Sequence, residues 1–187
     1  MVFEKNRNKV SVVIPTYNRK QYLEESIASV KNQTYKKFEI LVVDDGSDEK
    51  TATLIKQLRN ETGLSIQHAW HEDNGFQKCA IMNQAITLSR GNYLIFSDGD
   101  CIPRKDFVGK HVQKRRPGKF LSGGYTKLSM EASDEIQRNQ IESGLAFDPG
   151  FLAQYGLKRK WSAKHCAKGR HAALMNFLTP TSPTWNG

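Results

Sequence analysis

Two patterns of apolar residues alternate along the first half of the chain. Short continuous apolar runs rich in β-branched residues predict strands that are buried on both faces. Longer stretches between them repeat apolar residues every three or four positions and predict helices. The predicted strands are residues 10–15, 38–45, 64–70 and 92–98, and the predicted helices are residues 19–33, 48–63 and 75–91. This order predicts an α/β fold with a Rossmann-like, mainly parallel sheet flanked by helices.

Residues at the ends of the predicted helices indicate where each one begins or stops. Asn18 precedes the first helix, and we expect its side chain to cap the helix N-terminus. Gly63 and Gly91 follow the second and third helices, and we expect them to end those helices.

The pattern is less regular in the second half. Residues 106–116 have helical spacing. The stretch "KFLSGGYTKLS" (119–129) predicts a strand pair, or one bulged strand, around its two glycines. No repeat, low-complexity linker or clear boundary interrupts the chain, so we expect residues 1–187 to form a single domain.

A formal net charge of +9 favours anionic partners, namely nucleic acid, an anionic membrane face or phosphorylated small molecules. No nucleic-acid-binding signature accompanies the charge, so we expect no nucleic-acid partner. The cations gather in residues 104–119 and 158–170. Each of these two basic stretches is either a solvated face or a contact with acidic lipid.

The cysteines and the absence of long apolar runs indicate a cellular location. Three widely spaced cysteines with no CxxC argue against a disulfide framework and a structural zinc site, and favour a reducing compartment. No run is long enough to cross a bilayer, and the N-terminus lacks the apolar core of a signal peptide. We therefore expect a cytoplasmic protein whose basic stretches are available to the inner face of the membrane.

Polar residues follow all four predicted strands. The sequences at these ends are "PTYNR", "DDGSD", "HEDNG" and "SDGDC", and three of them carry carboxylates. Ligands of open parallel sheets bind outside the carboxyl ends of the strands. Four polar ends that converge on one edge predict a binding site there, which a single acidic loop would not.

Asp98 and Asp100 flank Gly99 directly after the last predicted strand. In extended backbone their side chains point the same way, and glycine lets a ligand or metal approach the chain closely. Paired hard oxygen ligands suit Mg²⁺ or Mn²⁺ shared with a diphosphate, and the ion would remove the repulsion between the carboxylates. The alternative is a plain turn, because Asp-Gly is a common turn dipeptide.

Residues 10–51 resemble the opening of family 2 glycosyltransferases, which have the GT-A fold. "DNGFQKCAIMNQAI" and "GNYLIFSDGDCIPRKDFV" resemble the next two motifs of that family, in the same order. The likeness is dense from about residue 10 to about residue 110. It implies a nucleotide-binding part over about 9–104 and an incomplete acceptor-side part over about 105–187. It also implies metal-dependent, inverting transfer of a hexosyl or N-acetylhexosaminyl group from a nucleotide-diphosphate donor, expected to be a UDP-sugar.

The resemblance also assigns roles to single residues. It implies nucleotide binding by Pro15, Thr16, Tyr17, Asp45, Gly75, Lys78, Asn83 and Asp98, and binding of Mn²⁺ or Mg²⁺ by Asp98 and Asp100. Tyr17 lies against the base, Asp45 hydrogen-bonds it, and Gln77 and Lys78 lie where they reach donor phosphates. The alternatives are that Tyr17 is a packing aromatic and that Lys78 is a solvated helix residue. Asp44 is expected to cap a turn instead of touching ligand.

Three other readings stay open on the sequence. "ILVVDDGSD" resembles a response-regulator receiver, but Asp98 lies five residues before Pro103 and Asp100 three, where a receiver requires four. "LIFSDGDCI" approximates the nucleophile motif of haloacid-dehalogenase phosphatases, which normally follows a first strand instead of a fourth. The third reading is a donor-binding domain without turnover.

The third reading rests on the C-terminal end, "TPTSPTWNG". In the resembling family a later acidic segment supplies the carboxylate that deprotonates the acceptor, so we expect the catalytic base beyond Gly187. The carboxylates after Asp106 are Glu131, Asp134, Glu135, Glu142 and Asp148, and none lies in a family-like motif. We further expect self-association through apolar residues near Leu174 and Trp185. The expected acceptor is a glycan or lipid-linked saccharide, as in polysaccharide biosynthesis.

Overall fold

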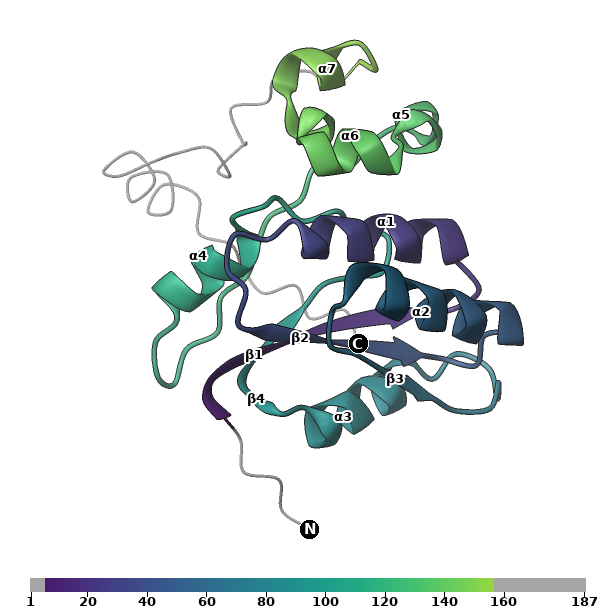
Figure 1. Cartoon of the computed structure of the whole chain (residues 1–187), viewed down its shortest axis with the longest axis vertical. Helices are drawn as coiled ribbons and strands as arrows, with labels where there is room; N and C mark the ends of the chain where they lie inside the picture. Colours follow the sequence, from purple (N-terminus) through teal and green to yellow (C-terminus); the bar gives the residue numbers. More distant parts are fainter. Residues whose placement is uncertain (1–5, 157–187) are drawn as a thin grey trace.

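A four-stranded parallel sheet organises the chain in this computed structural model, which describes residues 6–156 (Figure 1). The strands lie in the order β3-β2-β1-β4, and all neighbours are parallel. Their bounds are β1 (Asn6–Thr16), β2 (Phe38–Asp44), β3 (Ile66–Trp70) and β4 (Gly91–Phe96). The predicted α/β class, with a mainly parallel sheet, is confirmed.

Helices cover both faces of the sheet. Helices α1 (Lys20–Lys31) and α2 (Glu49–Thr62) lie on one face and α3 (Lys78–Leu88) on the other (Figure 1). A fourth helix, α4 (Phe107–Lys114), packs on the α1 and α2 face through the buried Val108. Because strand residues alternate between faces, Val12 and Ile14 join one core while Val13 joins the other.

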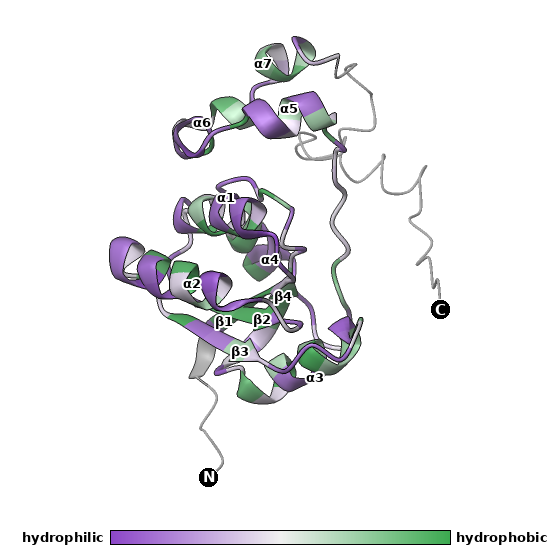
Figure 2. Ribbon diagram, turned by 90° about the vertical axis from the view of Figure 1, so that its right-hand side faces the viewer, coloured by the Kyte–Doolittle hydropathy of each residue, from purple (hydrophilic) through white to green (hydrophobic). Residues whose placement is uncertain are grey.

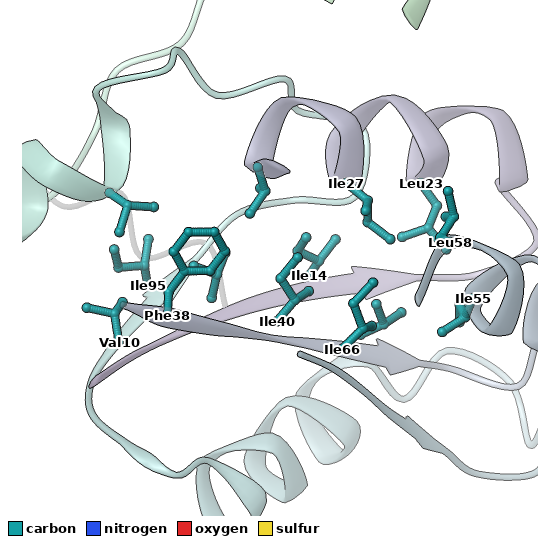
Figure 3. Close-up of a cluster of buried hydrophobic side chains, with 14 residues drawn as sticks. Val10, Ile14, Leu23, Ile27, Phe38, Ile40, Ile55, Leu58, Ile66 and Ile95 are labelled. Atoms are coloured by element: carbon teal, nitrogen blue, oxygen red, sulfur yellow. The ribbon is translucent and has the colours of Figure 1, made fainter. Parts of the chain in front are cut away.

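The larger core lies between the sheet and α1 and α2. Figure 3 shows its side chains pointing into the space between these layers: Val10, Ile14, Leu23, Ile27, Phe38, Ile40, Ile55, Leu58, Ile66 and Ile95. The smaller core, under α3, contains Val13, Leu41, Val43, Ala69, Ile81 and Ala85. Burial of apolar side chains on both sides fixes the sheet in position.

Residues 130–153 form a small lobe against the outer side of α1 (Figures 1 and 2). The lobe contains α5 (Met130–Glu135), α6 (Arg138–Ser143), the 3₁₀ helix η1 (Leu145–Phe147) and α7 (Pro149–Ala153), and we call it the α5–α7 lobe. Its own apolar cluster includes Ile136, Ile141 and Ala146. Arg138 joins it to the helices below through ion pairs of 3.4 Å to both Glu24 and Glu61.

Two local predictions are wrong. Asn18 does not cap α1: it has a left-handed φ of 51°, and its Oδ1 accepts the Asp48 N–H at 3.0 Å, so it ties the β1 end to the β2 end. Residues 119–129 form neither a strand pair nor a bulged strand, and Phe120 and Tyr125 in this stretch are exposed. These residues favour strand formation, but they pair with no strand of the described sheet.

Two glycines lie near the predicted helix ends. Gly63 ends α2 in the left-handed conformation, as predicted. Gly91 instead begins β4, while α3 already stops at Leu88. A Cβ on Gly91 would lie 2.6 Å from Ser11 Oγ, so close packing explains this glycine.

Several expectations concern residues outside the described range. The basic stretch 158–170 and the apolar residues near Leu174 and Trp185 fall there. Of the basic stretch 104–119, most side chains are exposed or partly exposed. Among residues 6–156, no helix combines the length and apolar character needed to cross a bilayer.

A buried carboxylate joins three segments at the amino ends of the strands. Glu39 Oε1 accepts the Ser11 hydroxyl and the Arg90 N–H, both at 2.7 Å, and its Oε2 lies 3.0 Å from Lys9 Nζ. Desolvation raises the pKa of Glu39, but these donors outweigh it and hold the pKa below its usual value of 4.5. The ionised form therefore stabilises the fold.

We predict that Glu39→Gln lowers the free energy of unfolding by about 2 kcal/mol at pH 7, because charged hydrogen bonds are lost. The folded-state pKa is depressed, so this contribution is present above the unfolded pKa and is lost as pH falls through the folded pKa. Urea denaturation should show the wild type and the variant converging below about pH 4. Asp134→Asn, on an exposed position, is the control. A difference that stays constant down to pH 3 would contradict this role.

Candidate functional site

The strand register brings the ends of β1, β2 and β4 to one edge of the sheet. Thr16 is paired with Asp44, and Val13 with Phe96. Beyond the ladder, the Asp45 N–H donates to the Thr16 carbonyl at 3.0 Å, and the Ser97 N–H donates to the Val13 carbonyl at 3.0 Å. The Thr16 side chain is itself buried. Backbone pairing with the end of β2 therefore sets the position of Thr16 at this edge of the sheet.

Two adjacent aspartates at the end of β2 have different partners. Asp44 is fully buried and accepts the Ser47 N–H at 2.8 Å and His68 Nε2 at 3.0 Å, which is the turn-capping role expected for it. Asp45 is 6% exposed and accepts His71 Nε2 at 2.7 Å and the Gln77 N–H at 3.0 Å. Asp45 is thus held by a side chain after β3 and by the backbone before α3.

The loop between β3 and α3 is fastened to the other strand ends through Asp73. Its Oδ2 accepts the Tyr17 hydroxyl at 2.9 Å, and its Oδ1 accepts the Gly75 N–H at 3.1 Å. The hydrogen bond to Asp73, together with its negative charge, raises the pKa of Tyr17. Gly46 packs so tightly on Asp73 that a Cβ would lie 2.5 Å from its Cα. Tyr17 remains about half exposed, so its ring has a free surface at the site.

The acidic segment after β4 is a turn, closed by a hydrogen bond of 3.1 Å from the Cys101 N–H to the Asp98 carbonyl. The extended geometry expected for Asp98 and Asp100 is therefore wrong. Gly99 has a structural role that was not expected: a Cβ there would lie 2.2 Å from the Pro15 carbonyl oxygen. The glycine permits close contact with the end of β1, which holds the acidic turn against the candidate nucleotide residues.

Lys78, the first residue of α3, forms an ion pair with this turn. Its Nζ lies 2.7 Å from Asp98 Oδ1, so it is not the purely solvated lysine of the alternative reading. Asp98 and Asp100 are exposed, and Cys101 beside them is half-buried. Burial, together with the negative charges of Asp100 and Asp98, raises the pKa of the Cys101 thiol to about 11. The turn thus carries Asp98, Asp100 and Cys101, and Lys78 of α3 lies beside it.

The segment after the acidic turn is fixed at two places. Ile102 packs against the apolar cluster of the α5–α7 lobe. Gln33, fully buried after α1, donates to the Arg104 carbonyl at 2.7 Å and accepts the Val108 N–H at 2.9 Å. The Thr34 N–H adds a bond of 2.8 Å to the Lys105 carbonyl. The turn is therefore anchored on β1 before it and on α1 and the lobe after it.

The predicted residues do not all join one contact network. Asn83 is exposed on α3 and makes no hydrogen bond to another candidate residue in the described chain. Gly75 has a φ of +83° and serves the turn that presents Asp73. The roles of three residues in holding the site were not predicted from the sequence: His71, Asp73 and Gln33. The first two belong to "HEDNG", which was noted as a polar strand end, whereas no signal marked Gln33.

The acidic turn has suitable chemistry for a divalent cation. Asp98 and Asp100 supply hard oxygen ligands from one turn, and both side chains are open to solvent. No group of three or more His, Cys, Asp or Glu residues able to hold a metal occurs within residues 6–156. Mg²⁺ usually takes one or two carboxylates from a protein and its remaining ligands from water and substrate phosphates, so two exposed carboxylates are chemically compatible with such an ion.

Comparison with known proteins identifies a family. The sequence model of glycosyl transferase family 2 matches residues 11–170. The chain is 33% identical over 105 residues to chondroitin synthase of Escherichia coli, which is 56% of this chain and 15% of that protein. It is 34% identical over 104 residues to hyaluronan synthase of Pasteurella multocida, covering 55% and 10% of the two chains. The chain thus spans a small part of the curated relatives it matches.

Solved structures share the fold. A crystal structure of residues 1–349 of TarS from S. aureus has a TM-score of 0.51 and 29% identity, covering 56% of this chain and 31% of that one. Mannosyltransferase PcManGT from Pyrobaculum calidifontis, in complex with GDP-Man and Mn²⁺, has a TM-score of 0.52 and 26% identity, covering 58% and 32%. A UDP complex of TarS has a TM-score of 0.51 and 25% identity, covering 62% and 38%.

We predict that Gln33→Leu loosens the segment that follows the acidic turn. The variant leaves the Arg104 carbonyl and the Val108 N–H without their buried partner, which should lower the free energy of unfolding by about 2 kcal/mol. Hydrogen exchange of the Val108 amide should become faster. Gln84→Leu, at an exposed position on α3, is the matched control. Exchange at the wild-type rate in Gln33→Leu would show that Gln33 does not hold this segment.

Proposed function

The chain belongs to glycosyl transferase family 2 and has the GT-A fold of its structural neighbours, and from this premise we propose that it binds a nucleotide-diphosphate sugar and transfers the sugar to an acceptor hydroxyl. One observation carries the proposal. The ends of β1, β2 and β4 place an aromatic ring, a buried aspartate and a lysine-paired acidic turn along one edge of the sheet. An aromatic ring and an aspartate can bind the base, and a lysine beside an acidic turn can bind the diphosphate and its cation.

At the base end, we assign nucleotide reading to Asp45 and Tyr17. A carboxylate accepts the imino N–H of uracil, and this preference favours UDP over cytidine nucleotides, whose ring nitrogen has no hydrogen. His71 and the Gln77 N–H fix the orientation of Asp45, so little side-chain freedom is lost on binding. The exposed face of Tyr17 offers a stacking surface while its hydroxyl stays on Asp73.

At the phosphate end, we assign Asp98 and Asp100 to a divalent cation and Lys78 to the diphosphate. When bound, Mn²⁺ or Mg²⁺ would offset the negative charge that grows on the leaving diphosphate. The turn that presents the carboxylates is fixed by Pro15 and Gly99. The complexes of PcManGT with GDP-Man and Mn²⁺ and of TarS with UDP support a site for a nucleotide and a divalent cation.

The acceptor side is assigned more coarsely. We propose that the acceptor is a hydroxyl on a growing glycan or lipid-linked saccharide and that a hexosyl or N-acetylhexosaminyl group is transferred. Similarity to chondroitin and hyaluronan synthases supports this assignment. Inverting transfer requires a base opposite the leaving group. Among the described carboxylates after Asp106, three have structural partners: Glu135 binds Tyr155, Glu142 binds Arg138, and Asp148 caps α7. We assign none of them as the base.

We predict that UDP binds only together with Mn²⁺ or Mg²⁺. Calorimetry should show binding in Mn²⁺ and little in EDTA, because Asp98 and Asp100 would hold an ion that offsets the charge of the diphosphate. Asp100→Ala should abolish this metal dependence, leaving weak binding that is the same in both buffers. Asp134→Ala is the control for loss of one carboxylate. Equally tight binding of UDP by the wild type in EDTA would contradict the metal role.

We predict that Asp45→Ala weakens discrimination between UDP and CDP. Loss of a charged hydrogen bond should reduce UDP affinity by about tenfold while CDP affinity changes much less. His71→Ala should produce part of the same loss, since Asp45 is then less well oriented. Competition binding with both nucleotides in Mn²⁺ measures the ratio. An unchanged UDP-to-CDP ratio in Asp45→Ala would show that Asp45 does not read the base.

A further inference from the structure

The ion pair between Lys78 and Asp98 has a feature that helix stability does not explain. Lys78 is the first residue of α3, where the positive end of the helix dipole disfavours a cation. The first turn of α3 has no acidic residue to compensate. The partner of Lys78 lies 20 positions later, on the acidic turn, at 2.7 Å. The lysine therefore serves the turn and not its own helix.

The same carboxylate is a candidate ligand of the divalent cation. An ammonium group at 2.7 Å from Asp98 Oδ1 occupies a position next to the one that a metal ion would take. Two cations this close repel one another strongly. Lys78 therefore has to leave Asp98 when the metal ion binds, and its flexible four-carbon stem allows this movement. A diphosphate bound to the same ion would offer the lysine a new anionic partner.

We propose that Lys78 is an exchangeable cation of the site: it neutralises Asp98 when no donor is bound and moves to the donor diphosphate when metal and nucleotide bind. This inference rests on the proposed function. Metal alone binds weakly because it has to displace Lys78 without offering the lysine a new partner. Metal and nucleotide together supply that partner, so each strengthens the binding of the other by the same factor.

A plain surface salt bridge would behave differently. Exposed ion pairs contribute little to stability, and removing one changes little else. An exchangeable lysine predicts opposite changes in two affinities when its charge is removed. Metal alone should bind more tightly, since its competitor has gone, and nucleotide should bind less tightly in saturating metal, since the diphosphate has lost a cation.

The test is Lys78→Met, with Mn²⁺ and UDP as the probes. Electron paramagnetic resonance of free Mn²⁺ measures metal binding without nucleotide, and calorimetry in saturating Mn²⁺ measures UDP binding. We expect Lys78→Met to bind Mn²⁺ roughly threefold more tightly than the wild type. We expect it to bind UDP about tenfold more weakly. Lys78→Arg should keep the direction of the wild-type coupling, because it keeps the charge.

Lys56→Met is the matched control, since it removes one positive charge from an exposed position on α2. Both affinities should stay at wild-type values in this variant. If Lys78→Met leaves Mn²⁺ affinity unchanged or weakens it while the wild type binds UDP with Mn²⁺, the exchange is wrong and the proposed function stands. If the wild type itself binds no UDP with Mn²⁺, the proposed function fails and the exchange fails with it.

Discussion

Parallel pairing of β1 with both β2 and β4 is the constraint on which the site depends. The pairing sets three strand ends at one level, and hydrogen bonds from Asp45 to Thr16 and from Ser97 to Val13 continue it past the ladder. The candidate residues lie far apart in sequence, and contacts such as Tyr17 to Asp73 and Lys78 to Asp98 then join the segments that this pairing brings together. Apolar packing on both faces of the sheet holds this register, because a shift of one residue would move buried side chains to the opposite face.

The second constraint is the management of negative charge at that edge. Asp44, Asp45 and Asp73 each accept a hydrogen bond from a backbone N–H group, so their charge is stabilised within the fold. Asp98 and Asp100 remain exposed, and Lys78 is the cation beside them. Asp44 and Asp73 therefore hold the loops of the site together, whereas Asp45, Asp98 and Asp100 are the carboxylates that we propose meet the ligand. This division also explains why a basic chain carries an acidic turn at its site.

Much of this fold and site could be predicted because both follow from local patterns. Continuous apolar runs gave the four strands, and their polar ends gave the edge on which Tyr17, Asp45 and Asp98 lie. Residues whose roles depend on distant contacts were missed or misread. Asn18 bridges to Asp48 instead of capping α1, Gly99 packs closely on Pro15, and Gln33 binds backbone groups more than 70 positions away. Residues 119–129 show the same limit, since strand propensity forms no strand without a paired neighbour.

The central claim is that the acidic turn and the end of β2 bind opposite ends of one nucleotide. A crystal structure of the chain soaked with UDP and Mn²⁺, with anomalous scattering from manganese, tests it most directly. We predict an anomalous peak against the Asp98 and Asp100 carboxylates, and the uracil ring within hydrogen-bond distance of Asp45 and stacked on Tyr17. A nucleotide bound away from the carboxyl edge of the sheet, or manganese bound elsewhere, would contradict it.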